Sequence, residues 1–153
     1  KRELCREVPQ PLKGLQGFEN PQLCMPGVIA LQTKKFSSYA DAVKEMESLN
    51  EQLSIINDPL KDVAQIIISD DSSFTAANLR NYLWVSYTRV NPSHDVYGIK
   101  SFVENKHWGC NGPVVFDARL KPHHAPPVEK NAAVEKRIDR LFEKGGSMFG
   151  VLK

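Results

Sequence analysis

Two adjacent carboxylates, Asp70 and Asp71, follow an apolar run at 66–68 and are the first candidates for chemistry. In α/β proteins, ligands bind beyond the carboxyl ends of the strands, so this pair could hold Mg²⁺ or transfer a proton. The alternative is a solvated turn that begins the next helix, a position in which Asp is common. The turn is the favoured interpretation.

Paired histidines and paired lysines are the next candidates. His123 and His124 could bind a metal, but no Cys or carboxylate stands at a ligand spacing, so a surface linker is favoured. Lys34 and Lys35 lie between an expected strand and an expected helix, where a phosphate could meet a helix N-terminus. Their segment lacks the glycines of a P-loop, so an exposed turn remains the alternative.

An aromatic segment at 101–113, which we expect to be a loop, contains Phe102, His107 and Trp108. Aromatic side chains on a loop often form a binding surface, whereas core packing beneath the loop is the competing interpretation, and both stay open. The sequence has no HExxH or GxGxxG motif and no recognisable Ser-His-Asp set. The residues alone therefore predict no self-contained catalytic site.

Alternating strands and helices must position these residues. Apolar segments bounded by turn residues predict strands at 27–33, 63–69, 95–99 and 114–116. Apolar spacing also predicts three helices. These are a helix capped by Ser38 that carries Val43, Met46, Leu49, Leu53 and Ile56, a second helix capped by Thr75, and an amphipathic helix at 129–144.

The order of these elements predicts an α/β fold, a single three-layer domain with a mixed, mainly parallel sheet. The continuous run Ile66–Ile68 is typical of a sheet covered on both faces. A Pro-rich stretch at 122–127 precedes the last helix. We therefore expect the domain to span 1–127, and a protruding C-terminal helix and tail at 128–153 to contact another subunit.

The composition is that of one globular domain, with 153 residues, 41% hydrophobic and 25% charged. A formal net charge of +2 does not favour nucleic acid as a partner. No apolar run approaches the roughly 18 residues of a membrane span, so no membrane contact is expected. Cys5, Cys24 and Cys110 form no CxxC pair, and we expect reduced thiols in a cytoplasmic protein. The missing initiator Met leaves open a processed chain or a piece of a longer one.

Four blocks of the sequence resemble one family in order and spacing. They are Asn20–Cys24 with Val28–Lys35, then Ile66–Asp71, then Leu83-Trp84, Thr88–Val90, Pro92 and Asp95, and finally Gly112 with Val114–Ala118. These blocks resemble the C-terminal domain of UbiD-like decarboxylases, a family that includes polyprenyl-hydroxybenzoate decarboxylase, ferulic acid decarboxylase and carboxylases of aromatic compounds.

The resemblance implies a reversible decarboxylase or carboxylase that acts on an aromatic or unsaturated acid with prenylated FMN. In that family the catalytic Glu-Arg-Glu network, the divalent metal, K⁺ and most flavin contacts lie in a larger N-terminal domain. The chain is therefore expected to be a C-terminal domain or small subunit, inactive and without cofactor alone, in a hetero-oligomer with a large flavin-binding partner. A scaffold subunit without a catalytic role is the alternative.

The resemblance also carries over individual residues. Lys61 falls near a lysine that approaches the cofactor in some members. Asn105 and His107 align with residues that line the substrate, and Phe102 and Trp108 flank them.

Two departures from the family pattern stand beside these matches. The acidic loop reads Asp71-Ser72-Ser73, with reduced charge. The polar pair Asn105 and His107 replaces an expected apolar wall, which indicates a polar or phosphorylated substrate, or a role away from the substrate.

Overall fold

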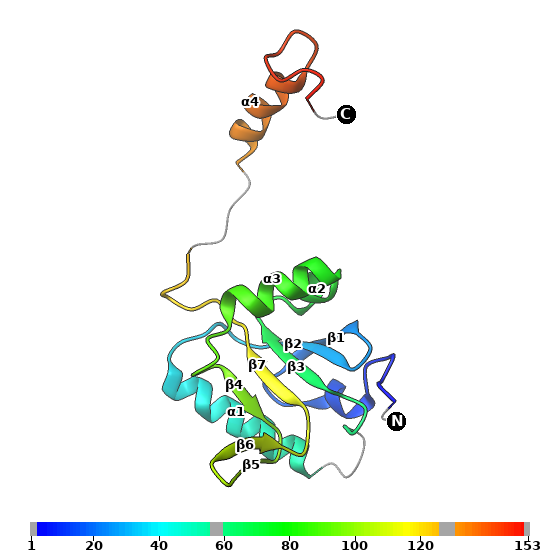
Figure 1. Cartoon of the computed structure of the whole chain (residues 1–153), viewed down its shortest axis with the longest axis vertical. Coiled ribbons are helices and arrows are strands. Elements are labelled where there is room, and N and C mark those ends of the chain that lie inside the picture. Colours follow the sequence, from blue (N-terminus) through cyan, green and yellow to red (C-terminus); the bar gives the residue numbers. More distant parts are fainter. Residues whose placement is uncertain (1–2, 56–59, 126–130, 152–153) are drawn as a thin grey trace.

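The computed structural model of the chain describes residues 3–55, 60–125 and 131–151. A three-layer domain holds most of these residues, and a C-terminal helix stands apart from it (Figure 1). The elements in chain order are η1 (Gln10–Gly14), β1 (Glu19–Met25), β2 (Val28–Gln32), α1 (Tyr39–Ser54), β3 (Gln65–Ser69), α2 (Ser72–Ala76), α3 (Leu79–Arg89), β4 (Val96–Gly98), β5 (Ser101–Glu104), β6 (His107–Cys110), β7 (Val114–Asp117) and α4 (Ala132–Phe142).

The main sheet has the strand order β1-β2-β3-β7-β4. The central strands β2, β3 and β7 run parallel, with Ile29 opposite Ile66 and Ile67 opposite Phe116. The two edge strands, β1 and β4, pair antiparallel with their neighbours. The predicted α/β class with a mixed sheet is therefore confirmed, and the carboxyl ends of three parallel strands meet at one edge.

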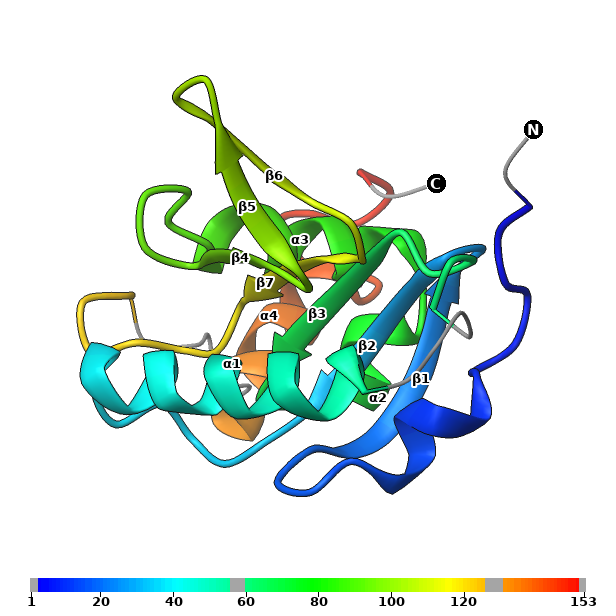
Figure 2. The same ribbon diagram turned by 90° about the horizontal axis from the view of Figure 1, so that it is seen from below.

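Helices cover both faces of the sheet, as the apolar run in β3 predicts. Ile66 and Ile68 pack in one cluster with Leu49 of α1, whereas Ile67 packs in a second cluster with Val85 of α3. All three isoleucines are completely buried. Each contributes about 1.5–3 kcal/mol of transfer free energy. Figure 2 shows α1 along one face of the sheet and α3 on the other.

Helix α1 begins where the sequence predicts. The Ser38 hydroxyl accepts a hydrogen bond from the Asp41 backbone N–H at 3.1 Å and donates to the Asp41 carboxylate at 2.8 Å. The first bond caps one backbone N–H of the first turn. Donation by the Ser37 hydroxyl and then by Ser38 holds the pKa of Asp41 below its ordinary value. Of the predicted apolar face, Met46, Leu49 and Leu53 are buried, Val43 is exposed, and Ile56 lies outside the described residues.

The segment after β3 differs from the prediction in one detail. Asp71 caps the short helix α2 by accepting from the Phe74 backbone N–H at 2.8 Å, and Asn78 caps α3 by accepting from Asn81 at 2.9 Å. The prediction that Thr75 caps the second helix is wrong, because Thr75 lies buried inside α2. The stretch from 71 to 78 contains Asp, Ser, Thr and Asn, all favoured N-cap residues, so the sequence alone does not decide which of them caps the helix.

The expected loop at 101–113 is wrong in part, because strands β5 and β6 pair there as an antiparallel hairpin. Asn105 and Lys106 connect the strands with φ of 49° and 66°. Positive φ at both central residues is the mark of a type I′ turn, whose twist matches that of a hairpin. The sequence signal is weak because Lys106 occupies a position that usually carries Gly.

Helix α4 protrudes from the domain, as expected (Figure 1). Asn131 caps it, and every side chain from Ala132 to Leu141 is exposed. The predicted boundary at 127 lies outside the described residues, as do the first two residues of the predicted helix. No helix in the described ranges has the length and hydrophobicity needed to cross a membrane.

Candidate functional site

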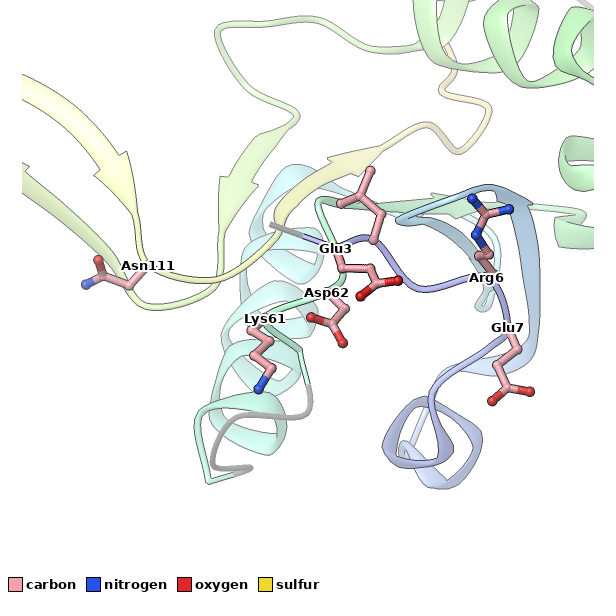
Figure 3. Close-up of a pocket in the computed structure, with 7 residues that line it drawn as sticks. Glu3, Arg6, Glu7, Lys61, Asp62 and Asn111 are labelled. Atoms are coloured by element: carbon pink, nitrogen blue, oxygen red, sulfur yellow. The ribbon is translucent and has the colours of Figure 1, made fainter. Parts of the chain in front are cut away.

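Lys61 lies at the amino edge of the parallel strands, just before β3. It lines a cleft of about 780 Å³ together with Glu3, Arg6, Asp62 and Asn111 (Figure 3). It also lines a smaller hollow of about 220 Å³ with Asn111 and with Lys100, which adjoins β5. The structure therefore brings Lys61 to the base of the β5–β6 hairpin, which contains the other predicted site residues.

The cleft around Lys61 does not fit a whole flavin. Its side chains are charged or polar except Leu4, and all but Asp62 are exposed to solvent. Cofactor sites are mostly apolar and enclose the greater part of the ligand. Three carboxylates, those of Glu3, Glu7 and Asp62, would also repel a phosphate group. The residues that line this cleft therefore do not fit a flavin by themselves.

The hairpin divides the predicted substrate residues between two faces. Phe102 pairs with Gly109 and Glu104 pairs with His107, so Phe102 and His107 share one face. Trp108 lies on the opposite face, where it borders a hollow of about 240 Å³ against Val43 and Met46 of α1. Asn105 occupies the turn.

Close approach and exposure define these two faces further. A side chain at Gly109 would lie 2.6 Å from the Phe102 ring, so this glycine lets the ring cover its partner strand. Phe102 is 42% exposed and Trp108 49% exposed. Both large apolar side chains therefore remain partly uncovered by the described residues.

A network of charged side chains, in which Asp117 and Arg119 are buried, lies at the carboxyl edge of the sheet. Arg119 donates to the Asp117 carboxylate at 2.9 and 2.7 Å and pairs with Glu45 of α1 at 2.6 Å. Lys34 pairs with the same Glu45 at 2.9 Å. Although burial alone would lower the pKa of Arg119, its hydrogen bonds and proximity to Asp117 and Glu45 raise it. This network ties β7 to α1.

A second buried ion pair adjoins the first. The Lys121 ammonium lies 3.3 Å from Asp95 and donates to the Asp117 carbonyl oxygen at 2.8 Å. Burial, with the nearby charges of Asp117 and Asp95, raises the pKa of Tyr97 to about 12. Sequence reasoning missed both networks. Their signal is the alternation of charged Asp117, Arg119 and Lys121 with apolar Ala118 and Leu120.

Asp70 and Asp71 are both engaged in protein contacts. Asp70 accepts from Arg89 at 3.2 Å and from the Leu120 backbone N–H at 2.7 Å, while Asp71 caps α2. Across the described ranges, no group of three His, Cys, Asp or Glu side chains could hold a metal ion. These contacts agree with the favoured turn interpretation.

His124 has a local structural contact. Its Nδ1 atom accepts from the Lys121 backbone N–H at 3.0 Å, and its ring lies 4.5 Å from that of His123. Burial, together with the neighbouring His123 and Lys121, lowers the pKa of His124. The neutral imidazole thus helps to fix the start of the segment that leads towards α4.

No protein-family model matches the chain. It is 28% identical over 90 residues to a Chlamydia pneumoniae protein named as a subunit of 4-hydroxybenzoate decarboxylase, and the match covers 58% of this chain and 15% of that protein. It is 23% identical over 141 residues to an uncharacterised protein of Chlamydia muridarum, covering 91% of this chain and 22% of the relative. The chain thus spans 15 to 22% of the length of these curated relatives.

Two solved structures align with the chain at low identity. The open form of vanillic acid decarboxylase from Sedimentibacter hydroxybenzoicus has a TM-score of 0.48 and 17% identity, covering 88% of this chain and 30% of that one. An evolved dimeric form of the UbiD-class enzyme HmfF from Pelotomaculum thermopropionicum, in complex with prFMN, also has a TM-score of 0.48, with 14% identity, covering 82% and 26%. The resemblance to UbiD-like decarboxylases that the four sequence blocks indicate is confirmed by the relative named as a hydroxybenzoate decarboxylase subunit.

Proposed function

We propose that this chain is the C-terminal domain or small subunit of a UbiD-like reversible decarboxylase or carboxylase that acts on an aromatic or unsaturated carboxylic acid. The observation that carries the proposal is the similarity to the relative named as a subunit of 4-hydroxybenzoate decarboxylase. A large partner subunit or domain holds prenylated FMN, a divalent metal and K⁺, and the two together form a hetero-oligomer. The isolated chain is inactive.

In this proposal the hairpin roofs the substrate pocket. A flavin held by the partner would supply the electron sink for the charge that develops as CO₂ leaves, which protein side chains alone stabilise poorly. The exposed Phe102 ring excludes water from one side, and His107 on the same face can donate to a polar substituent of the substrate. Trp108 braces the hairpin against α1, and Asn105 holds the turn. Lys61 contacts the cofactor at the base of the hairpin.

Helix α4 supplies the contact for assembly. Val134, Ile138 and Leu141 recur at helical spacing on one face and are 40%, 45% and 42% exposed. A helix with an apolar stripe gains stability by burying that stripe against another element. The partner subunit is the surface that covers it in this proposal.

A non-catalytic scaffold subunit is the second candidate. The observation that favours it is the polar pair Asn105 and His107, both exposed to solvent, where an apolar wall is expected. A scaffold would retain α4 and the buried core but would not depend on the hairpin side chains for turnover.

Affinity purification of the tagged chain with its large partner separates the two candidates. The complex is assayed for flavin absorbance and for release of CO₂ from 4-hydroxybenzoate and related acids. If the chain roofs the pocket, Phe102→Ala and His107→Ala lower kcat/KM without loss of assembly. Val103→Ala is the matched control, because Val103 is 71% exposed on the other face of the hairpin.

Three other results would contradict a catalytic role for the chain or its dependence on a partner. Unchanged turnover in Phe102→Ala and His107→Ala, with loss of the complex in Ile138→Asp, would establish the scaffold. Turnover by the isolated chain, or a pure chain that binds flavin, would refute the dependence on a partner. Failure to recover any flavin-binding partner would refute both candidates for a separate subunit.

A further inference from the structure

A cavity of about 610 Å³ opens at the carboxyl edge of the sheet, at the end of the parallel strands opposite to Lys61. Its size lies within the range of small-molecule sites, and this edge is where α/β sheets present ligands. The loops after β2, β3 and β7 and the helices α2 and α3 line it. The early candidates Lys35, Asp70 and Asp71 line it, whereas Lys61 and the hairpin residues at 102–108 do not.

Three aromatic rings form the walls of this cavity, those of Phe36, Phe74 and Trp84. The rings of Phe74 and Trp84 meet edge to face with centroids 6.2 Å apart, and each side chain is 45% exposed. Phe36 lies over the cationic groups of Arg119 and Lys121, at 5.6 and 5.4 Å. Aromatic walls of this kind favour a planar ring, which can stack on one wall and meet another with its edge.

The cationic side chains of Arg89 and Lys35 favour a negatively charged ligand in this cavity. The Arg89 guanidinium lies 4.9 Å over the Trp84 ring, and only its Nη1 atom has a hydrogen-bond partner, Asp70, among the residues that the structure describes. Lys35 lines the same cavity from an exposed position. The two carboxylates each hold protein donors, because Asp70 Oδ2 accepts from both Arg89 and Leu120 and Asp71 Oδ1 caps α2. Cations outnumber carboxylates in the lining, with Lys35, Arg89 and Lys121 against Asp70 and Asp71.

From these observations we infer that the cavity is a second binding site, for a planar aromatic carboxylate. The ring lies among Phe36, Phe74 and Trp84, and the carboxylate accepts from the free N–H groups of Arg89, with Lys35 adding attraction at the rim. Arginine suits this role because its planar fork matches a carboxylate while its face stacks on an aromatic ring. The site belongs to this chain alone and requires no partner subunit.

The test uses naphthalene-2-carboxylate with the full chain and follows the two tryptophan indole N–H signals by NMR. The Trp108→Phe variant assigns the remaining signal to Trp84. We expect the Trp84 signal to shift with saturating behaviour while the Trp108 signal stays in place. The neutral amide of the same ring should bind at least about tenfold more weakly, because it lacks the charge-assisted hydrogen bond to Arg89.

Two variants and one matched control locate the carboxylate. Arg89→Gln should weaken binding at least about tenfold, and Lys35→Gln about two- to fivefold. Arg80→Gln changes a cation of the same helix that does not line the cavity, and it should bind as the parent does. Circular dichroism checks that each variant is folded. If Arg89→Gln unfolds, the Lys35→Gln variant still tests the inference, because Lys35 is exposed and its substitution should not disturb the fold.

Three outcomes would overturn the inference. The first is a Trp84 signal that does not shift when the carboxylate is added, and the second is equal binding of the carboxylate and the amide. The third is a Trp84 signal that shifts with the concentration of the chain alone. The last would mean that another copy of the chain covers this surface. Because no partner and no flavin enter the measurement, its failure would leave the proposed decarboxylase role untouched.

Discussion

The ammonium group of Lys121 lies 3.3 Å from the carboxylate of Asp95, and the two side chains are 0% and 1% exposed. This buried pair joins the segment after β7 to the residue before β4, and Asp95 also accepts from the Asn91 backbone N–H at 2.7 Å. The Lys121–Asp95 pair thus holds the end of β7 and the start of β4 together at the carboxyl edge of the sheet.

Removing one partner of this pair should destabilise the fold strongly. Lys121→Met leaves Asp95 buried without its counter-charge, and such losses cost about 3–5 kcal/mol. The free energy of unfolding from urea denaturation measures the effect. Lys136→Met on the exposed α4 is the control and should change stability by less than about 0.5 kcal/mol. A Lys121→Met chain as stable as the control would contradict the structural role of the pair.

The central strand should be sensitive to truncation on its α3 face. Ile67→Ala removes a completely buried side chain and should lower the free energy of unfolding by about 2–5 kcal/mol. Val103→Ala on the exposed hairpin should change it by about 0.5 kcal/mol or less. Equal effects of the two substitutions would mean that α3 does not cover the sheet.

The N-cap of α1 should contribute measurably. Ser38→Ala removes the acceptor of the Asp41 N–H and should cost about 0.5–2 kcal/mol. Ser147→Ala, in the exposed segment after α4, serves as the matched control. Thermal unfolding of both variants beside the parent checks this, and coincident curves would rule out the cap.

The stability of the chain should decrease on the acid side of neutrality through His124. Its pKa in the folded chain lies below the ordinary value of 6.5, first because of burial and then because of His123 and Lys121. Between the two pKa values the unfolded chain binds more protons, so the contribution is complete above about pH 6.5 and is lost as the pH falls towards the folded pKa. Urea denaturation between pH 5 and 8 measures the slope.

The His124→Asn variant should reduce that slope, because the amide oxygen can still accept from Lys121 but does not titrate in this range. Val103→Ala changes an exposed side chain that does not titrate and should leave the slope unaltered. The same pH dependence in parent and His124→Asn chains would assign the effect to other groups.

The sequence was sufficient where a local signal matches the structure. The apolar run at Ile66–Ile68 predicts a strand covered on both faces, and Ser38 with Asp41 predicts the start of α1. The β5–β6 hairpin escaped prediction because Asn105-Lys106 forms a turn for which Asn-Gly is the usual signal. Local patterns decide elements only when they are unambiguous.

The site was harder to predict because its geometry depends on distant pairings. The hairpin register separates Phe102 from Trp108, although both lie in one short aromatic segment. Glu45 and Arg119 form an ion pair although they lie far apart in the sequence, and no spacing rule connects them. The cavity at Trp84 and Arg89 likewise forms only when α3 packs beside the loops that follow β2, β3 and β7.

The charges at Asp117, Arg119 and Lys121 also guard against misfolding. A slip of β7 by one residue would exchange the two sides of the strand and carry Arg119 away from Glu45 of α1. Each displaced charge would then be buried without a partner, which would destabilise the misaligned sheet by several kcal/mol. The buried ion pairs therefore favour the native register of the sheet, because they destabilise a misaligned sheet more than hydrophobic contacts alone would.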